Sequence, residues 1–176
     1  MDRLKYLAGY GPTIQEQARS LIESGSLADW LGNRYGQPHE VRNDRALYEY
    51  AVAIKDRYLR KTEPLHKVLY DNRLQVMKHA LGTHTAISRV QGSRLKASRE
   101  IRIASVFREA PAPFLQMIVV HELAHLKERD HGKSFYQLCT HMAPDYHELE
   151  LGLRLYLTHK DLASTGEPLL PRTVDR

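Results

Sequence analysis

The stretch VVHELAHLKERDHGKSFYQLC, residues 119–139, decides how this sequence is interpreted. It contains an H-E-x-x-H pattern that begins at His121 and ends at His125. The apolar run before the pattern, together with two prolines that suit the first turn of a helix, predicts a helix over residues 111–127. At 100° per residue the two histidines lie about 40° apart and one turn apart in height, so both imidazoles can reach one ion.

These residue types fit zinc chemistry. Neutral imidazole nitrogens bind the ion, three protein ligands leave a fourth position for water, and the ion lowers the pKa of that water towards about 7. Glu122 lies only about 60° beyond His125 around the helix, so its carboxylate can face the water. The sequence therefore predicts one zinc ion as cofactor and Glu122 as the general base.

A catalytic zinc site needs a third protein ligand, and His131 is the best candidate. It follows His121 by ten residues, at a break in the helical pattern where Gly132 can let the chain fold back. The spacing also fits the extended pattern H-E-x-x-H-x-x-G-x-x-H of the secreted metzincins, but Glu128 occupies the glycine position. The competing third ligands are His141, His147, Glu148 and Glu150.

Helical periodicity predicts further helices on both sides of the motif. The N-terminal third contains two short helical patterns and a longer one that begins near Asn43 or Asp44 and ends before Pro64. After the motif, helices are expected over residues 133–142 and 146–157, and a mobile tail is expected after Lys160.

Between the helical regions the apolar period shortens. Residues 68–76 are typical of two short strands around a turn, although a helix fits nearly as well. Residues 85–90 and 100–107 are better strands, and Gly92 and Ser93 mark a turn between them. This predicted hairpin carries most of the chain's net charge of +5, through Arg89, Arg94, Lys96, Arg99 and Arg102.

Composition sets the broad class of the protein. The 176 residues are 42% hydrophobic and 27% charged, as expected of one globular domain, and no apolar stretch is long enough to span a membrane. The start of the chain has no long apolar signal core, and the single Cys139 cannot form an intramolecular disulfide. We therefore expect a cytoplasmic protein. Its basic balance favours an anionic partner such as a nucleotide or a nucleic acid.

The motif stretch, the upstream VQGSRLKASREIRIASVF and the downstream HMAPDYHELELGLRLYL closely resemble the YgjP-like family of metal-dependent hydrolases. The resemblance supports His121, His125 and His131 as ligands and Glu122 as the catalytic acid/base. The segment HGKSF is also similar to the third-ligand segment of SprT-like zincins. The resemblance implies an α+β, zincin-like metallopeptidase fold in which a short sheet packs on the motif helix.

This resemblance covers most of the chain. With the helical patterns, it predicts an N-terminal helical region over residues 1–62, a zincin-like hydrolase core over residues 63–160 and a tail over residues 161–176.

Three functions are consistent with these features. The first is a zinc-dependent peptidase, in which an edge strand near residues 100–107 pairs with an extended peptide. The second is a nucleoside triphosphate pyrophosphatase acting on UTP, an activity that the family resemblance implies, with Arg94, Lys96, Arg99 or Arg102 neutralising the triphosphate. The third is a DNA-associated SprT-like zincin.

A transition-state stabiliser is expected beside the metal, and Arg129, Tyr136 and Arg154 are its candidates.

Overall fold

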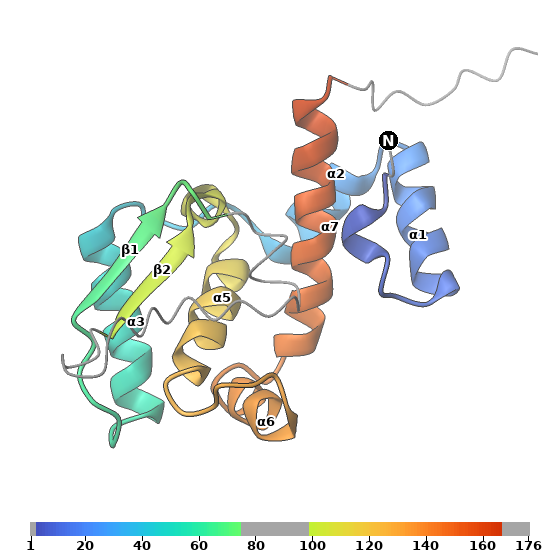
Figure 1. Cartoon of the computed structure of the whole chain (residues 1–176). Helices are drawn as coiled ribbons and strands as arrows, with labels where there is room; N and C mark the ends of the chain where they lie inside the picture. Colours follow the sequence, from blue (N-terminus) through green and yellow to red (C-terminus); the bar gives the residue numbers. More distant parts are fainter. Residues whose placement is uncertain (1–2, 75–98, 167–176) are drawn as a thin grey trace, which may run out of the picture. The chain divides into compact units, whose positions relative to one another are not determined.

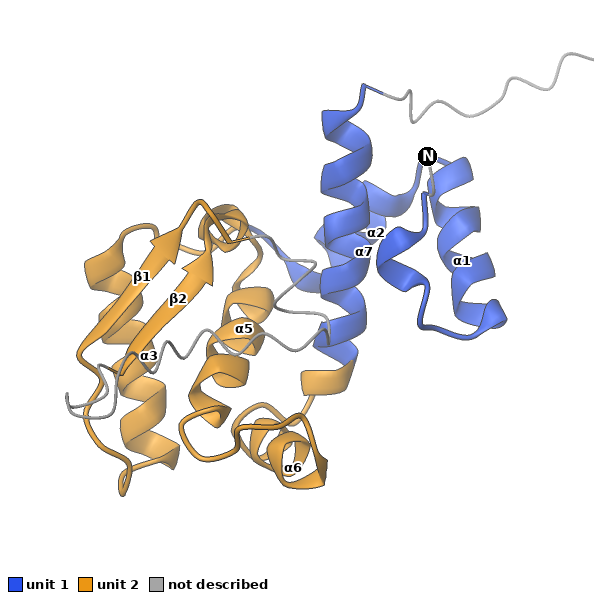
Figure 2. Cartoon of the chain, viewed as in Figure 1, with its two compact units in different colours: residues 1–37, 148–176 blue, residues 38–147 orange. Residues whose placement is uncertain are grey.

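The computed structural model describes residues 3–74 and 99–166 (Figure 1). These residues belong to two compact units, which Figure 2 distinguishes by colour. Unit 1 combines the two ends of the chain, Met1–Gln37 and Glu148–Arg176, and unit 2 is the continuous segment Pro38–His147. The H-E-x-x-H pattern lies in unit 2.

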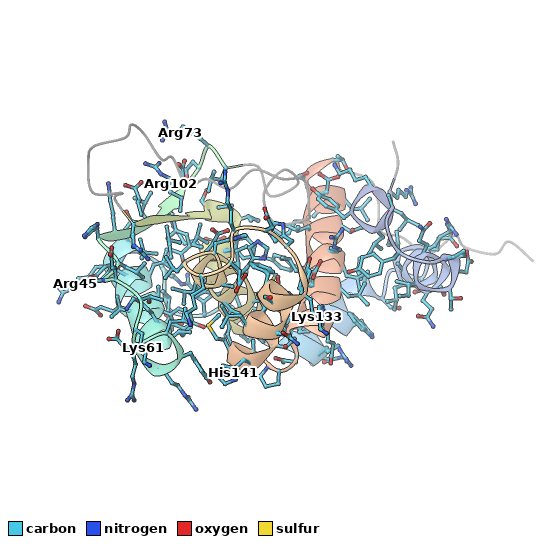
Figure 3. The ribbon with its side chains drawn as sticks, turned by 60° about the horizontal axis from the view of Figure 1, so that its bottom comes forward. Arg45, Lys61, Arg73, Arg102, Lys133 and His141 are labelled. Carbon is cyan, nitrogen blue, oxygen red and sulfur yellow. The ribbon has the colours of Figure 1, made fainter. Side chains whose placement is uncertain are left out.

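Unit 2 contains a small sheet covered by helices on one side. Strands β1 (Lys67–Asp71) and β2 (Glu100–Ala104) pair in parallel, with Val68 opposite Ile101 and Tyr70 opposite Ile103. Helices α3 (Asp44–Tyr58) and α5 (Ala112–Ala124) lie on the same face of this sheet (Figures 1 and 3). Helix α6 (Lys133–Met142) packs against α5.

Local sequence accounts for the bounds of α3. The Asn43 side chain accepts a hydrogen bond from the Ala46 backbone N–H at 2.9 Å, which caps the helix where the sequence predicts its start. Leu47 and Ala51 are fully buried and repeat at four-residue spacing, which defines the face that packs on β1.

Helix α5 is the most deeply buried helix of unit 2 among the described residues. Pro111 precedes its first turn, and nine of its thirteen residues are buried. The helix is apolar on nearly all sides because it contacts β2, α3 and α6. It ends at Ala124, three residues before the predicted end at residue 127.

The sheet differs from the predicted hairpins. β1 begins one residue before the predicted 68–76 hairpin and covers its first strand, but β2 pairs with it in parallel. A parallel pair requires a crossover connection rather than a tight turn. The predicted strand 85–90, the turn at Gly92 and Ser93, and residues 75–76 lie outside the described residues. β2 is also shorter than the predicted 100–107 strand, because the chain turns into the 3-10 helix η2 (Ser105–Glu109).

Unit 1 is helical throughout its described part. It contains the 3-10 helix η1 (Lys5–Leu7), α1 (Pro12–Glu23), α2 (Leu27–Tyr35) and most of α7 (Tyr146–Ser164). Helix α7 extends seven residues beyond the predicted end at residue 157, so residues 161–164 of the predicted tail are helical.

A glycine determines how α2 packs on α7. A Cβ added at Gly152 would overlap the ring and hydroxyl of Tyr35, which is 8% exposed. Gly152 therefore leaves the space that the Tyr35 side chain occupies.

The mixed helical structure and small parallel sheet are compatible with a zincin-like domain. The two compact units have other bounds than the predicted regions 1–62, 63–160 and 161–176, but they are defined by contacts within the chain and do not test a division into functional regions. That division therefore stays a prediction. No helix in the described ranges is both long and apolar enough to span a bilayer.

Candidate metal centre

The last turn of α5 brings two histidine side chains to one face. His121 lies inside the helix, and His125 forms its C-cap with φ −65° and ψ −12°, which is still right-handed helical backbone. The Leu126 N–H donates to the Leu123 carbonyl at 3.0 Å, so the chain tightens directly after His125.

A short loop returns the chain to these two side chains. The Gly132 N–H donates to the Asp130 carbonyl at 2.8 Å, and α6 then begins at Lys133. This turn brings the Nε2 atom of His131 to 3.1 Å from Nε2 of His125 and 3.2 Å from Nε2 of His121. The three imidazoles therefore present their Nε2 atoms to one point.

The spacing of the three nitrogens fits a metal ion. Two nitrogens that each lie about 2.0–2.1 Å from a tetrahedral ion are about 3.3 Å apart, close to the separations seen here. Within the described ranges, His121, His125 and His131 form the group of His, Cys, Asp or Glu residues able to hold an ion, with all donor atoms within 4.8 Å of one another.

The other ring nitrogens of His121 and His125 have oxygen partners. Nδ1 of His125 lies 2.9 Å from the Glu128 carbonyl oxygen, and Nδ1 of His121 lies 2.7 Å from the Tyr146 hydroxyl. A carbonyl oxygen only accepts, so Nδ1 of His125 must carry the proton and Nε2 the lone pair. Contacts of this kind orient histidine ligands in metal sites.

One aromatic ring supports the three imidazoles. Phe135 is fully buried in the first half of α6, and its ring centroid lies 4.7–5.0 Å from those of His121, His125 and His131. Its position explains why α6 packs against the end of α5.

Burial perturbs the two groups at the start of the motif. Burial, and then the neighbouring His125 and His131, lower the pKa of His121 to about 3, which keeps its imidazole neutral near pH 7. Burial raises the pKa of Glu122 to about 7. A carboxyl group with a pKa near neutral pH can both accept and return a proton there.

Two of the competing ligands lie on or after α6 in unit 2, but they are not part of the cluster. His141 is exposed and packs edge-on against Tyr58, with 5.5 Å between ring centroids. His147 is also exposed, and its ring lies 5.4 Å from that of Tyr136.

The other competing ligands lie in unit 1, where arginines bind them. Glu148 forms an ion pair with Arg34, and Glu150 lies 3.4 Å from Arg154. Arg154, a candidate transition-state stabiliser, also donates to the Tyr6 carbonyl at 2.9 Å. The other two candidates for that role lie in unit 2, Arg129 exposed after the motif helix and Tyr136 half-buried beside Phe135.

Two of the basic residues predicted to bind phosphates can be placed, and Arg94 and Lys96 lie outside the described residues. Arg99 forms an ion pair with Glu63 at 3.2 Å. Arg102 binds Asp71 at 2.7 Å and also pairs with Glu100. Both guanidinium groups therefore already have carboxylate partners.

Asp71 is the centre of a small polar cluster at the end of the sheet. The backbone N–H of Arg73, and then the side chains of Arg102 and Arg73, hold the pKa of the Asp71 carboxyl well below its usual range. Figure 3 shows Arg73 and Arg102 together at this end of the sheet.

Two residues that contact the candidate ligands were not predicted from the sequence. Phe135 follows His131 closely but has no pattern that marks it as a support for the ligands. Tyr146 lies 25 residues after His121, and only the fold brings its hydroxyl to the ring. Neither role has a local sequence signal.

Comparisons with known proteins agree with these features. Residues 28–156 match the family model "YgjP-like, metallopeptidase domain". The chain is 54% identical over 162 residues to a protein of Escherichia coli (strain K12) named UTP pyrophosphatase. The aligned residues cover 92% of this chain and 97% of the relative. No solved structure matches the chain. The relative's name agrees with the second predicted function rather than with the peptidase prediction that comes first, and both findings support a hydrolase.

Proposed function

This chain belongs to the YgjP-like family, and on that basis we propose that it is a zinc-dependent nucleoside triphosphate pyrophosphatase acting on UTP. The observation that carries the proposal is the convergence of three imidazole Nε2 atoms, one of them on the residue before Glu122, in a chain 54% identical to a protein named UTP pyrophosphatase.

We assign His121, His125 and His131 as the ligands of one zinc ion. Three neutral imidazoles form the donor set of some catalytic zinc sites, and the oxygen partners of Nδ1 in His121 and His125 suit binding through Nε2. When bound, the ion supplies Lewis acidity, which stabilises charge on a phosphoryl oxygen and makes a nearby water more acidic.

Glu122 would act as the general base. Its carboxylate takes a proton from the attacking water while the water oxygen forms a bond to the α-phosphorus. The bond between that phosphorus and the bridging oxygen of the β-phosphate breaks, so UMP and pyrophosphate are the products. Glu122 then returns the proton to the leaving pyrophosphate or to solvent, which its pKa of about 7 favours.

Arg129 and Lys133 would neutralise the triphosphate. Each lies two residues from His131, and neither has an ion-pair partner among the described residues (Lys133 is labelled in Figure 3). The predicted role of Arg94, Lys96, Arg99 and Arg102 remains part of the proposal, but Arg99 and Arg102 would have to exchange carboxylate partners for phosphate.

The test is pyrophosphate release from UTP by the zinc-loaded protein, with Glu122→Gln as control. The variant keeps the shape of the side chain but cannot accept the proton, so we expect at least a hundredfold lower kcat and unchanged zinc content. In water enriched in oxygen-18, the label should enter UMP and not pyrophosphate. Equal turnover by both proteins would remove Glu122 from the mechanism, and label in pyrophosphate would place the attack on the β-phosphorus.

Substitutions of basic residues test the phosphate contacts. We expect Lys133→Gln to raise the KM for UTP severalfold with little change in kcat, because an exposed cation contributes mainly to binding. Arg102→Gln tests the predicted phosphate contact on the sheet, where the guanidinium would first have to leave Asp71. A larger rise in KM for the Arg102 variant would move the phosphate site to the sheet.

A peptidase is the second candidate, because the matching family model is described as a metallopeptidase domain. Zinc-loaded protein that leaves UTP intact but cleaves an unfolded protein, with cleavage lost in Glu122→Gln, would favour this candidate. The DNA-associated function remains a prediction, and DNA binding that weakens steeply with added salt would support it.

A further inference from the structure

Tyr146 makes a directional contact with His121. Its hydroxyl lies 2.7 Å from Nδ1, and the two ring planes differ by 17°. The ring centroids are 6.4 Å apart, close to the sum of the hydrogen bond and the two distances from ring centre to bonded atom. The rings therefore meet end to end and nearly in one plane, which directs the hydroxyl along the axis of the Nδ1–H bond.

The Tyr146 side chain has little freedom to leave this position. It is 1% exposed, at the first residue of α7, and its N–H donates to the Ala143 carbonyl at 3.0 Å. The rings of Tyr136 and His147 lie 6.2 Å and 5.6 Å from its own. A buried ring in these contacts places its hydroxyl at a fixed point.

The orientation of His121 relies on a side-chain contact, whereas that of His125 relies on a backbone contact. The Glu128 carbonyl fixes the tautomer of His125 from within the same segment of backbone. The oxygen that meets Nδ1 of His121 is the Tyr146 hydroxyl, and it comes from another helix. A lone pair on Nε2 of His121 requires the proton on Nδ1, and that proton needs a buried acceptor.

We propose that Tyr146 is a positioning residue of the metal centre: its hydroxyl accepts the Nδ1–H of His121 and holds Nε2 of that ring towards the ion. This inference rests on the metal site proposed above. It adds a residue outside the H-E-x-x-H stretch whose function is to orient a ligand rather than to contact the ion or the substrate.

The test is Tyr146→Phe in the full-length protein, which removes the hydroxyl and keeps the ring. Tyr70→Phe is the matched control, because Tyr70 is also buried in unit 2 and its hydroxyl donates to the Val41 carbonyl at 2.6 Å. Zinc affinity is measured for wild type and both variants by competition with a chromophoric chelator. Urea unfolding of the metal-free proteins measures the loss of stability from each lost hydroxyl.

We expect Tyr146→Phe to weaken zinc binding about 10–100-fold, as loss of such an outer contact typically does, and Tyr70→Phe to change it less than about threefold. In the wild type, the Nδ1 proton of His121 should exchange slowly with solvent in nitrogen-15 NMR spectra of the zinc-loaded protein. In Tyr146→Phe it should exchange faster, even where the fold is intact.

The outcomes separate the two proposals. A wild-type protein that binds no zinc overturns the metal centre and the role of Tyr146 together. Normal zinc binding by the wild type with equal affinity in Tyr146→Phe overturns only the role of Tyr146. Equal losses of zinc affinity in Tyr146→Phe and Tyr70→Phe would also overturn it, because they would show a general effect of destabilising unit 2.

Discussion

Replacing Glu122 with glutamine should change how the stability of the metal-free protein depends on pH. The buried His121 and the half-buried Glu122 change stability in opposite directions over the same pH range. The pKa of His121 is about 3 in the folded protein against 6.5 for the free group, so the stability that depends on its neutral form is present above pH 6.5 and is lost as the pH falls towards 3. The pKa of Glu122 is about 7 against 4.5, so its contribution is present below pH 4.5 and is lost as the pH rises towards 7.

The two contributions nearly cancel between pH 4.5 and 6.5. In this range the unfolded chain binds a proton at His121, and the folded protein retains one at Glu122. Each group alone would change the free energy of unfolding by about 2 kcal/mol across the range, in opposite directions. Wild-type stability should therefore be nearly constant there, whereas Glu122→Gln should lose about 2 kcal/mol as the pH falls from 6.5 to 4.5.

The assay is urea unfolding at pH 4.5, 5.5 and 6.5 in the presence of a chelator. The difference between wild type and variant cancels the other titrating groups. Glu109→Gln, which changes an exposed carboxylate of the same unit, is the control and should run parallel to wild type. Parallel curves for Glu122→Gln would refute the reasoning, because they would mean that Glu122 takes up no extra proton on folding.

Three further predictions concern packing and charge. Phe135→Leu should weaken zinc binding and cost about 1–1.5 kcal/mol of stability, because the smaller side chain supports the imidazoles less well; chelator competition and urea unfolding measure both effects. Gly152→Ala should cost about 1–3 kcal/mol of stability and lower the Tm, because the added Cβ overlaps Tyr35, even though alanine favours helices. A raised Tm would mean that Tyr35 moves aside freely. Asp71→Asn should be less stable than wild type at pH 7 but lose less stability as the pH falls below 3.8. The low pKa of Asp71 gives the wild type a stabilisation that is complete above pH 3.8 and is lost gradually below it; urea midpoints at pH 3 and pH 7 test this.

Local patterns in the sequence predicted the helices well. Asn43 predicted the start of α3 because its side chain caps a helix through contacts three residues away. The spacing of His121 and His125 predicted a shared helical face, and the structure brings their Nε2 atoms together with that of His131. The resemblance to the YgjP-like family is confirmed by the family model and by the close relative.

Long-range features were not predictable from the same patterns. The alternation of Ile101 and Ile103 indicates a strand but not its partner, so the parallel pairing with β1 was missed. The ion pair between Arg102 and Asp71 was missed for the same reason, because Asp71 lies 31 residues away in sequence. No local pattern distinguishes Tyr146 from the other tyrosines, and its contact with His121 exists only in the folded unit 2.

The close spacing of the three imidazoles along the chain has a consequence for folding. His121 and His131 are separated by only ten residues, and a loop of that length closes in about 10–100 ns. The length-dependent entropy of closing it is about 2 kcal/mol. The complete donor set can therefore assemble within one local segment, before the distant strands β1 and β2 find each other. A metal ion present during refolding should accordingly bind early and act as a nucleus for unit 2, rather than bind only after the protein has folded.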